Sequence, residues 1–510
     1  MIGVLRNLWR SLTSMGTALV LLFLLALAAV PGALLPQRSL NESKVAQYLV
    51  ENPGIGPWFD RLQLFDVFSS FWFTAIYVLL FVSLVGCLTP RIIEHVRSIR
   101  AVPVPAPRNL NRLPKHALVT VDGTPESVTA AVTAGLRGWR RRITRESDGV
   151  TEISAEKGFL REFGNIVFHF SLLGLLAAVA VGKMFGYEGN VIVIADSGPG
   201  FCSASPAAFD SFRAGSRVDG TSLYPICVRV NDFRARYLPN GQATSFASDI
   251  DYQAGADLAT GTWRPYRLEV NHPLRVGGDR VYLQGHGYAP TFTVTFPDGQ
   301  KRTQTVQFRP DNARTLLSSG TVRIDPPAGL YPPDQRRKHQ LAITGLFAPT
   351  REMDGKLLSS SFPAMNDPAV AVDIYRGDAG LDTGKPQSLF SIDPTLIEQK
   401  RLTKLKRVNL ALGQEVRLDD GTVVRFDNAT EFVNLQVSHD PGQFWVLVSA
   451  MAMMAGLLVS LVVRRRRVWA RIQTIEPGTV RVELGGLART DNSGWGGEFE
   501  RLARRLAEGS

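Results

Sequence analysis

Four stretches of the chain contain no Asp, Glu, Lys or Arg: residues 11–37, 67–90, 163–182 and 441–463. Each holds 20 to 27 residues, and a helix needs about 20 apolar residues to cross the hydrocarbon core of a membrane. Only 45% of the 510 residues are hydrophobic, so the overall composition does not indicate a membrane protein, whereas the clustering of apolar residues does. The pattern excludes a cytosolic enzyme and a disordered protein, and it predicts an integral membrane protein with four transmembrane α-helices.

Basic residues mark one side of these stretches. Arg6 and Arg10 precede the first stretch, Arg464 to Arg467 follow the last one without interruption, and the loop 91–162 is rich in arginine. Cytoplasmic segments of membrane proteins carry an excess of Lys and Arg, so we expect both termini and this loop to be cytoplasmic and the large segment 187–441 to be extracytoplasmic. The formal charge of +11 is thereby explained by orientation, and nucleic-acid binding is not expected.

Between the last two stretches, β-branched and aromatic runs alternate with turn residues, as in an antiparallel, sandwich-like all-β domain. We expect Pro90 to end the second helix, and Asn52-Pro53-Gly54 and Gly56-Pro57 to break any helix in the outer loop.

The chain is therefore predicted to be a multi-pass protein of the cell (plasma) membrane. Its predicted segments are transmembrane helix 1 (1–36), an extracytoplasmic loop (37–69), transmembrane helix 2 (70–90), a basic cytoplasmic loop with a small α+β module (91–162), transmembrane helix 3 (163–186), the β domain (187–441), transmembrane helix 4 (442–463) and a cytoplasmic tail (464–510).

The three cysteines are Cys87, Cys202 and Cys227. Cys202 and Cys227 lie in the predicted outer domain, where a disulfide can persist, and the sequence leaves a bridge and two separate thiols open. The sequence has no CxxC and no CxxCH motif, so we expect neither a thioredoxin-type redox site nor covalently attached c-type heme.

His169 lies within the third apolar stretch, where ionisable side chains are costly and indicate function. A neutral imidazole is a strong axial ligand for heme iron, and Asn165 lies one turn earlier on the same helix face; a hydrogen bond that only packs helices is the alternative. His272 and His286 flank a predicted hairpin turn at 277–279 and are interpreted as turn and surface groups, although a ligand role stays open. His439 precedes the fourth helix, and no catalytic constellation is found.

Four further sequence motifs are found. The first is residues 62–73, which lead into the second helix, together with Cys87-Leu-Thr-Pro-Arg91 at its end, and the second is Lys157-Gly-Phe-Leu-Arg-Glu-Phe-Gly-Asn-Ile-Val-Phe-His169. The third is Asp232-Phe233 with Tyr237-Leu-Pro-Asn-Gly241 and Phe246-Ala-Ser-Asp249, and the fourth is Val270-Asn-His-Pro-Leu-Arg275 with Tyr282-Leu-Gln284. Together with four apolar stretches and one large outer domain, they resemble the ResB (CcsB) family of System II cytochrome c biogenesis.

The resemblance implies that this chain is one half of a cytochrome c synthase and that this half is non-catalytic or co-catalytic. The other half is a ResC (CcsA)-type membrane protein with a tryptophan-rich WWD loop. The pair would move heme b, held non-covalently, across the membrane and attach it to the CxxCH motif of apocytochrome c; a thioredoxin-like apocytochrome reductase is a further expected partner.

By the same resemblance, His169 matches the transmembrane histidine of the family and is expected to ligate the heme iron. Asn165 and Arg161 complete the expected cofactor-binding set, with Arg161 facing a propionate or serving only as a positive anchor. Cys87 matches a cysteine often found at the end of the second helix. The alternative from a different class is a membrane-anchored scaffold or ligand sensor that binds no heme and tolerates His169→Leu.

Overall fold

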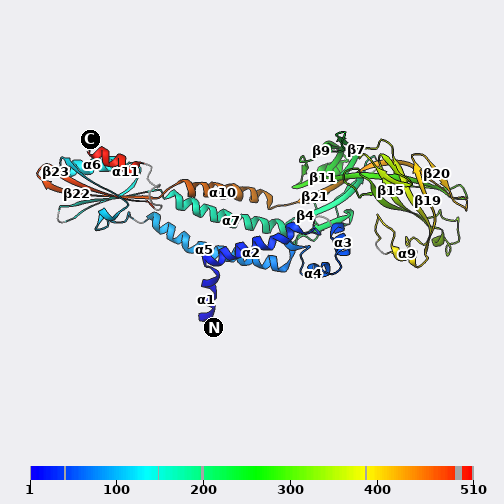
Figure 1. Cartoon of the computed structure of the whole chain (residues 1–510), viewed down its shortest axis with the longest axis horizontal. Helices are drawn as coiled ribbons and strands as arrows, with labels where there is room; N and C mark the ends of the chain where they lie inside the picture. The colour runs from blue at the N-terminus through cyan, green and yellow to red at the C-terminus, as the bar shows by residue number, and fades with distance from the viewer. Residues whose placement is uncertain are drawn as a thin grey trace. The chain divides into compact units, whose positions relative to one another are not determined.

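The computed structural model describes residues 2–39, 42–100, 102–146, 149–196, 200–384, 387–488 and 497–507. The chain forms two compact units, residues 1–180 together with 443–510, and residues 181–442. The first unit holds helices and a small α+β module, and the second is rich in β-structure (Figure 1).

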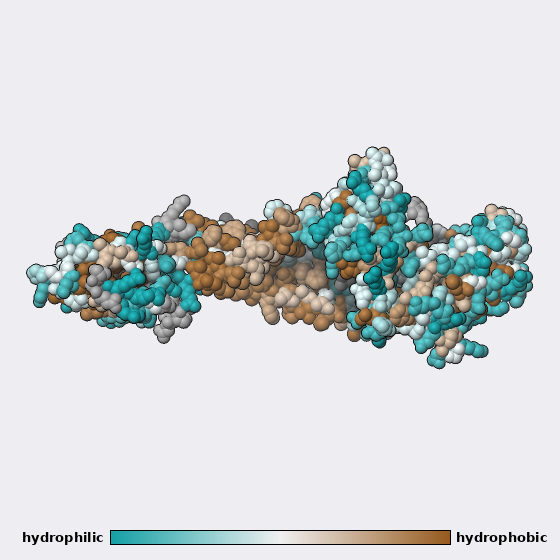
Figure 2. Space-filling model, turned by 90° about the horizontal axis from the view of Figure 1, so that it is seen from above, coloured by the Kyte–Doolittle hydropathy of each residue, from teal (hydrophilic) through white to brown (hydrophobic). Residues whose placement is uncertain are grey.

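Four helices of the described residues are long and apolar enough to cross a membrane, and they coincide with the four charge-free stretches. Their apolar side chains are mostly exposed on the chain itself, and Figure 2 shows hydrophobic residues gathered over them. They are α2 (Met15–Leu34), α5 (Phe71–Arg100), α7 (Leu160–Phe185) and α10 (Gln443–Val462).

The prediction that Pro90 ends the second helix is wrong, because α5 continues through it to Arg100. Leu84, Leu88 and His95 are buried along one face on both sides of the proline, so packing outweighs the one backbone hydrogen bond that proline removes. The prediction for Pro57 is also wrong. It lies in the first turn of a helix, where a missing N–H costs nothing. The loop 37–69 contains α3 (Glu42–Glu51) and α4 (Gly56–Arg61), and a separate α1 (Ile2–Leu12) precedes α2.

The predicted α+β module is present, but the loop 91–162 does not form it alone. Its five-stranded sheet has the order β1-β23-β22-β3-β2, so two strands of the C-terminal tail lie at its centre. Val132, Ile153, Val482 and Leu502 are among its core residues. The elements are β1 (Lys115–Asp122), α6 (Pro125–Gly135), β2 (Arg140–Arg145), β3 (Thr151–Lys157), β22 (Arg466–Glu476), β23 (Thr479–Ala488) and α11 (Glu498–Ala507).

Two long antiparallel strands, β11 (Asp279–Thr295) and β21 (Val423–His439), run through the whole β-rich unit. One half of this pair packs in a core with β4, β7, β8 and β9, which we call the first lobe. The other half packs in a second core with β14, β15, β18 and β19, the second lobe. The prediction of a large β-rich domain is thus confirmed.

The turns at 277–279 and 297–299 join β10 to β11 and β11 to β12, as their Gly and Asp residues predict. The remaining elements are β4 (Tyr187–Ile194), β5 (Phe201–Cys202), β6 (Ser211–Ala214), β7 (Ile226–Tyr237), β8 (Ala243–Ala254), α8 (Ala256–Thr260), β9 (Arg264–Glu269), β10 (Leu274–Val276), β12 (Lys301–Thr305), β13 (Arg309–Pro310), β14 (Ser318–Ile324), β15 (Leu341–Ala348), β16 (Arg351–Asp354), β17 (Leu357–Ser360), β18 (Ala369–Gly377), α9 (Pro394–Glu398), β19 (Leu402–Ala411) and β20 (Glu415–Arg417).

Cys202 and Cys227 form a disulfide between β5 and β7, which resolves the alternatives that the sequence left open. Cys87 is a free, half-buried thiol on α5.

Candidate functional site

His169 lies in the first half of α7, where that helix contacts α10 closely. A Cβ atom built on Gly164 would lie 2.8 Å from the main-chain oxygen of Gly456, and one built on Gly456 would lie 2.7 Å from the main-chain nitrogen of Phe168. The two glycines therefore let the helix backbones touch, as small residues do in membrane helices. His169 is half-buried, and its ring lies edge-on to Phe168 with centroids 5.1 Å apart.

A main-chain contact defines the tautomer of His169. Its Nδ1 lies 2.7 Å from the carbonyl oxygen of Asn165, and a carbonyl oxygen only accepts hydrogen bonds. Nδ1 therefore carries a proton, and in the neutral imidazole Nε2 keeps its lone pair. No hydrogen bond to Nε2 is found among the described residues. Histidines that bind metal ions characteristically donate the other N–H in this way.

Arg161, Asn165 and His169 follow one another at intervals of four residues, so they lie along one face of α7. The helix rises about 12 Å from Arg161 to His169. The structure thus brings the three predicted residues together on one stripe, but Asn165 contributes through its main-chain carbonyl. Arg161 is half-buried and makes no ion pair among the described residues.

The neighbouring Glu162 belongs to an ion-pair network that joins α7 to the tail. Arg465 binds Glu162 and Glu156, and Arg467 binds Glu156 at 2.8 Å. His95 lies on α5, inside one of the four long helices, and its Nδ1 is 3.5 Å from Glu162. Both ring nitrogens of His95 are buried, so they are not open to a ligand.

Beyond His169, the same face of α7 is apolar. Leu172, Leu173 and Leu176 pack against a cluster from α2 and α5 that includes Leu21 and Leu80. This face of α7 therefore carries an arginine near its start, then one imidazole, then leucines that are partly buried against α2 and α5. The described residues contain no group of three or more His, Cys, Asp or Glu side chains that could hold a bare metal ion.

The interpretation of His286 as a surface group is wrong. Its ring lies between Phe233 and Phe246, with centroid distances of 4.7 and 4.9 Å, and its Nε2 is 3.3 Å from the hydroxyl of Tyr237. Burial lowers the pKa of His286 to about 4, so the ring is neutral at physiological pH. It lines a cavity of about 390 Å³ with Tyr237 and Phe246, whereas His272 is exposed as predicted.

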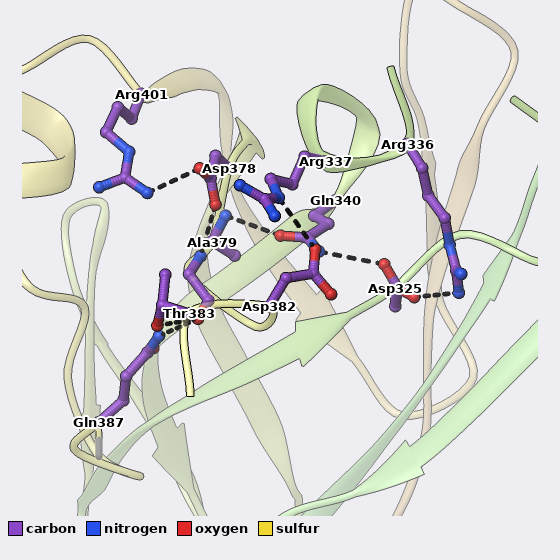
Figure 3. A network of polar contacts seen from close by, with 11 residues as sticks. Asp325, Arg336, Arg337, Gln340, Asp378, Ala379, Asp382, Thr383, Gln387 and Arg401 are labelled. Carbon is purple, nitrogen blue, oxygen red and sulfur yellow. Dashed lines mark hydrogen bonds and ion pairs between the residues drawn. The ribbon is translucent and has the colours of Figure 1, made fainter. Parts of the chain in front are cut away.

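A polar network in the second lobe surrounds Gln340, which is fully buried (Figure 3). Its amide nitrogen donates to Asp325 and Asp382, and its carbonyl oxygen accepts from the Ala379 main-chain N–H. Ion pairs extend the network to three arginines and border a basic cleft of about 610 Å³. Each of these arginines is already paired with a carboxylate, so the network holds the loop after β18 in place. The pairs are Arg336–Asp325, Arg337–Asp382 and Arg401–Asp378.

These features define the class of protein. The chain has four helices long enough to cross a membrane, one oriented imidazole on α7 and a large β-rich domain. The family model of the ResB-like family matches residues 15–500. The chain belongs to the ResB-like family.

Relatives named cytochrome c biogenesis protein CcsB match this chain. The protein from Prochlorococcus marinus (strain NATL1A) is 20% identical over 96% of both chains, and that from Synechococcus sp. (strain CC9311) is 23% identical over 99% of both. The protein from Gloeobacter violaceus is 28% identical, but that match spans 54% of this chain and only 57% of the relative.

Proposed function

We propose that this chain works in cytochrome c biogenesis as the ResB-type half of a heme-delivery and cytochrome c synthase complex. The observation that carries the proposal is the 2.7 Å contact between His169 Nδ1 and the Asn165 carbonyl, because it leaves Nε2 ready to bind iron. The relatives named cytochrome c biogenesis protein CcsB support the same process.

In this proposal the ligand is heme b, bound non-covalently as cargo; it supplies an iron that accepts imidazole nitrogen. His169 binds the iron through Nε2, the leucines beyond it exclude water from the ring, and Arg161 binds a propionate. His95 is closed to ligands, so a second imidazole is expected from a ResC (CcsA)-type partner. The chain is oriented with both termini in the cytoplasm and the β-rich domain outside.

The β-rich domain is proposed to hold apocytochrome c. The second lobe supports this, because β19 is an edge strand of its sheet and most of its residues are exposed. An open strand edge can bind an extended peptide by strand addition. Pull-down of an apocytochrome peptide by the wild-type chain, and its loss when Leu405 becomes proline, would test this; capture of the peptide by the ResC-type partner alone would contradict it.

The first experiment is a pyridine hemochrome assay with absorption spectra on the purified chain, with and without its ResC-type partner. His169→Ala should lose or shift the Soret band, because the ligand is gone. Asn165→Ala is the matched control: it keeps the main-chain carbonyl and should keep the band. If His169→Ala leaves the spectrum unchanged, the histidine only packs the helices. If no sample binds heme and His169→Leu is tolerated, the scaffold or sensor function gains support instead.

A further inference from the structure

A buried carboxylate organises a second histidine in the first lobe. Asp279, at the start of β11, is 1% exposed. One of its oxygens accepts a hydrogen bond from the hydroxyl of Tyr187 at 2.5 Å, and the other lies 2.7 Å from Nδ1 of His439. The cluster thus joins one residue from each of three adjacent strands, β4, β11 and β21.

The backbone packing around His439 fixes the position of its ring. Tyr187 stacks on the ring with centroids 5.3 Å apart and planes 11° from parallel. Gly186 lies so close that a Cβ atom there would be 2.8 Å from the His439 main-chain oxygen. The imidazole is therefore held on one face by a ring and at one edge by a carboxylate.

The outward edge of the ring is different. Burial raises the pKa of the Asp279 carboxyl, and the hydrogen bonds from Tyr187 and His439 act against this rise. The Asp279 carboxylate oxygen accepts the hydrogen bond that His439 Nδ1–H donates. In the neutral imidazole, Nε2 then carries the lone pair. The His439 side chain is 31% exposed, and Nε2 has no hydrogen bond among the described residues. A clamp that only holds three strands together explains Tyr187 and Asp279, but it leaves the accessible nitrogen without a use.

His169 and His439 thus share one arrangement: a short hydrogen bond from Nδ1 to a protein acceptor, and an open Nε2. Tyr187 follows the end of α7 by two residues, and His439 precedes the start of α10 by four. The helix rises about 24 Å from His169 to its end at Phe185. His439 therefore belongs to the far end of α7 from Arg161.

We propose that His439 is a second iron-binding histidine of this chain, oriented by Asp279 and Tyr187, and that its ligand is the iron of heme. This inference rests on the proposed function and extends it: His169 and His439 would each offer Nε2 to the same cargo, at successive points along α7. Asp279 and Tyr187 act as positioning residues, because they act through their contacts with the histidine ring.

The test uses the purified full chain in detergent, without the ResC-type partner, titrated with hemin and followed by absorption and electron paramagnetic resonance. In a His169→Ala background, the chain should retain a saturable low-spin or imidazole-ligated signal. Adding His439→Ala should abolish that signal, and adding Asp279→Asn should weaken hemin binding by about 10–100-fold. The matched control is His272→Ala in the same background, which removes an exposed histidine of the same lobe and should change nothing.

Two further measurements separate ligation from folding. His439→Gln keeps a donor for Asp279, so its circular dichroism should match that of wild type while its hemin signal is lost. Added imidazole should restore the iron-ligand spectrum in the His169→Ala, His439→Ala chain, which a purely structural role would not allow. If that double variant binds hemin like His169→Ala alone, the inference is wrong although the proposed function stands; if the wild-type chain binds no hemin with or without its partner, the proposed function fails first.

Discussion

The contact between α7 and α10 gives a sharp prediction for Gly456→Ala. A new Cβ atom would lie 2.7 Å from the Phe168 nitrogen and 2.8 Å from the Gly164 oxygen. Both are main-chain atoms, so neither can rotate away, and overpacking of this kind costs about 1–3 kcal/mol. Alanine gains about 1 kcal/mol over glycine within a helix. The comparison variant Gly16→Ala lies in the first turn of α2, where alanine gains less over glycine. Its Cβ atom would meet nothing closer than 3.9 Å, so it adds no steric clash.

Gly16→Ala adds a methyl group to a helix without a close contact, so the comparison shows the steric cost of the methyl group in Gly456→Ala. We expect Gly456→Ala to be less stable than Gly16→Ala by about 1–3 kcal/mol, measured by denaturant unfolding in detergent with helical circular dichroism. Phe168 adjoins His169, so the spectrum of bound hemin should also change in Gly456→Ala. Equal stability of the two variants would refute the close packing of α7 against α10.

Three other predictions concern single elements. Burial lowers the pKa of His286 to about 4, whereas a histidine in the unfolded chain has a pKa of about 6.5. As the pH falls below about 6.5, the unfolded chain binds a proton before the folded chain does, so the folded state loses stability. Wild type should lose up to roughly 3 kcal/mol of stability by pH 4 that His286→Phe does not lose, as urea unfolding across this range will show. The Cys202–Cys227 disulfide closes a sequence separation of 25 residues, so replacing both cysteines by alanine should cost about 3 kcal/mol, whereas Cys87→Ser should leave the melting temperature of the β-rich domain unchanged. A chain that stops after Arg464 lacks the two central strands of the α+β sheet, so limited proteolysis should cut within 102–157; resistance equal to that of the full chain would show that the tail is dispensable.

Features set by neighbouring residues could be predicted from the sequence. The four long helices follow from charge-free stretches of at least 20 residues, and the hairpin turn at 277–279 follows from its glycines. The helix stripe of Arg161, Asn165 and His169 follows from spacing alone. These features need no knowledge of what lies across the fold.

Features set by distant residues could not be predicted. The tail strand β22 pairs with β3, more than 300 residues earlier in the chain, and no local pattern names that neighbour. The sequence explains Arg465 and Arg467 only as a sign of a cytoplasmic tail, yet both bind buried Glu156. Asp279 and His439 are 160 positions apart. In the sequence, the one feature that draws attention to this pair is the histidine just before the fourth apolar stretch.

The acceptors of the two histidines differ, and the difference gives the proposed path a direction. His169 donates to a neutral carbonyl, whereas His439 donates to a carboxylate. A carboxylate makes the imidazole a more basic and stronger ligand, so heme bound by His439 is expected to be held more tightly than heme bound by His169, and the bound state nearer the end of α7 is favoured. Hemin dissociation constants of the His169→Ala and His439→Ala chains will measure this difference. Asp279→Asn should remove it by weakening the His439 site about 10–100-fold; a His439 site weaker than the His169 site with Asp279 intact would contradict a path that favours the far end of α7.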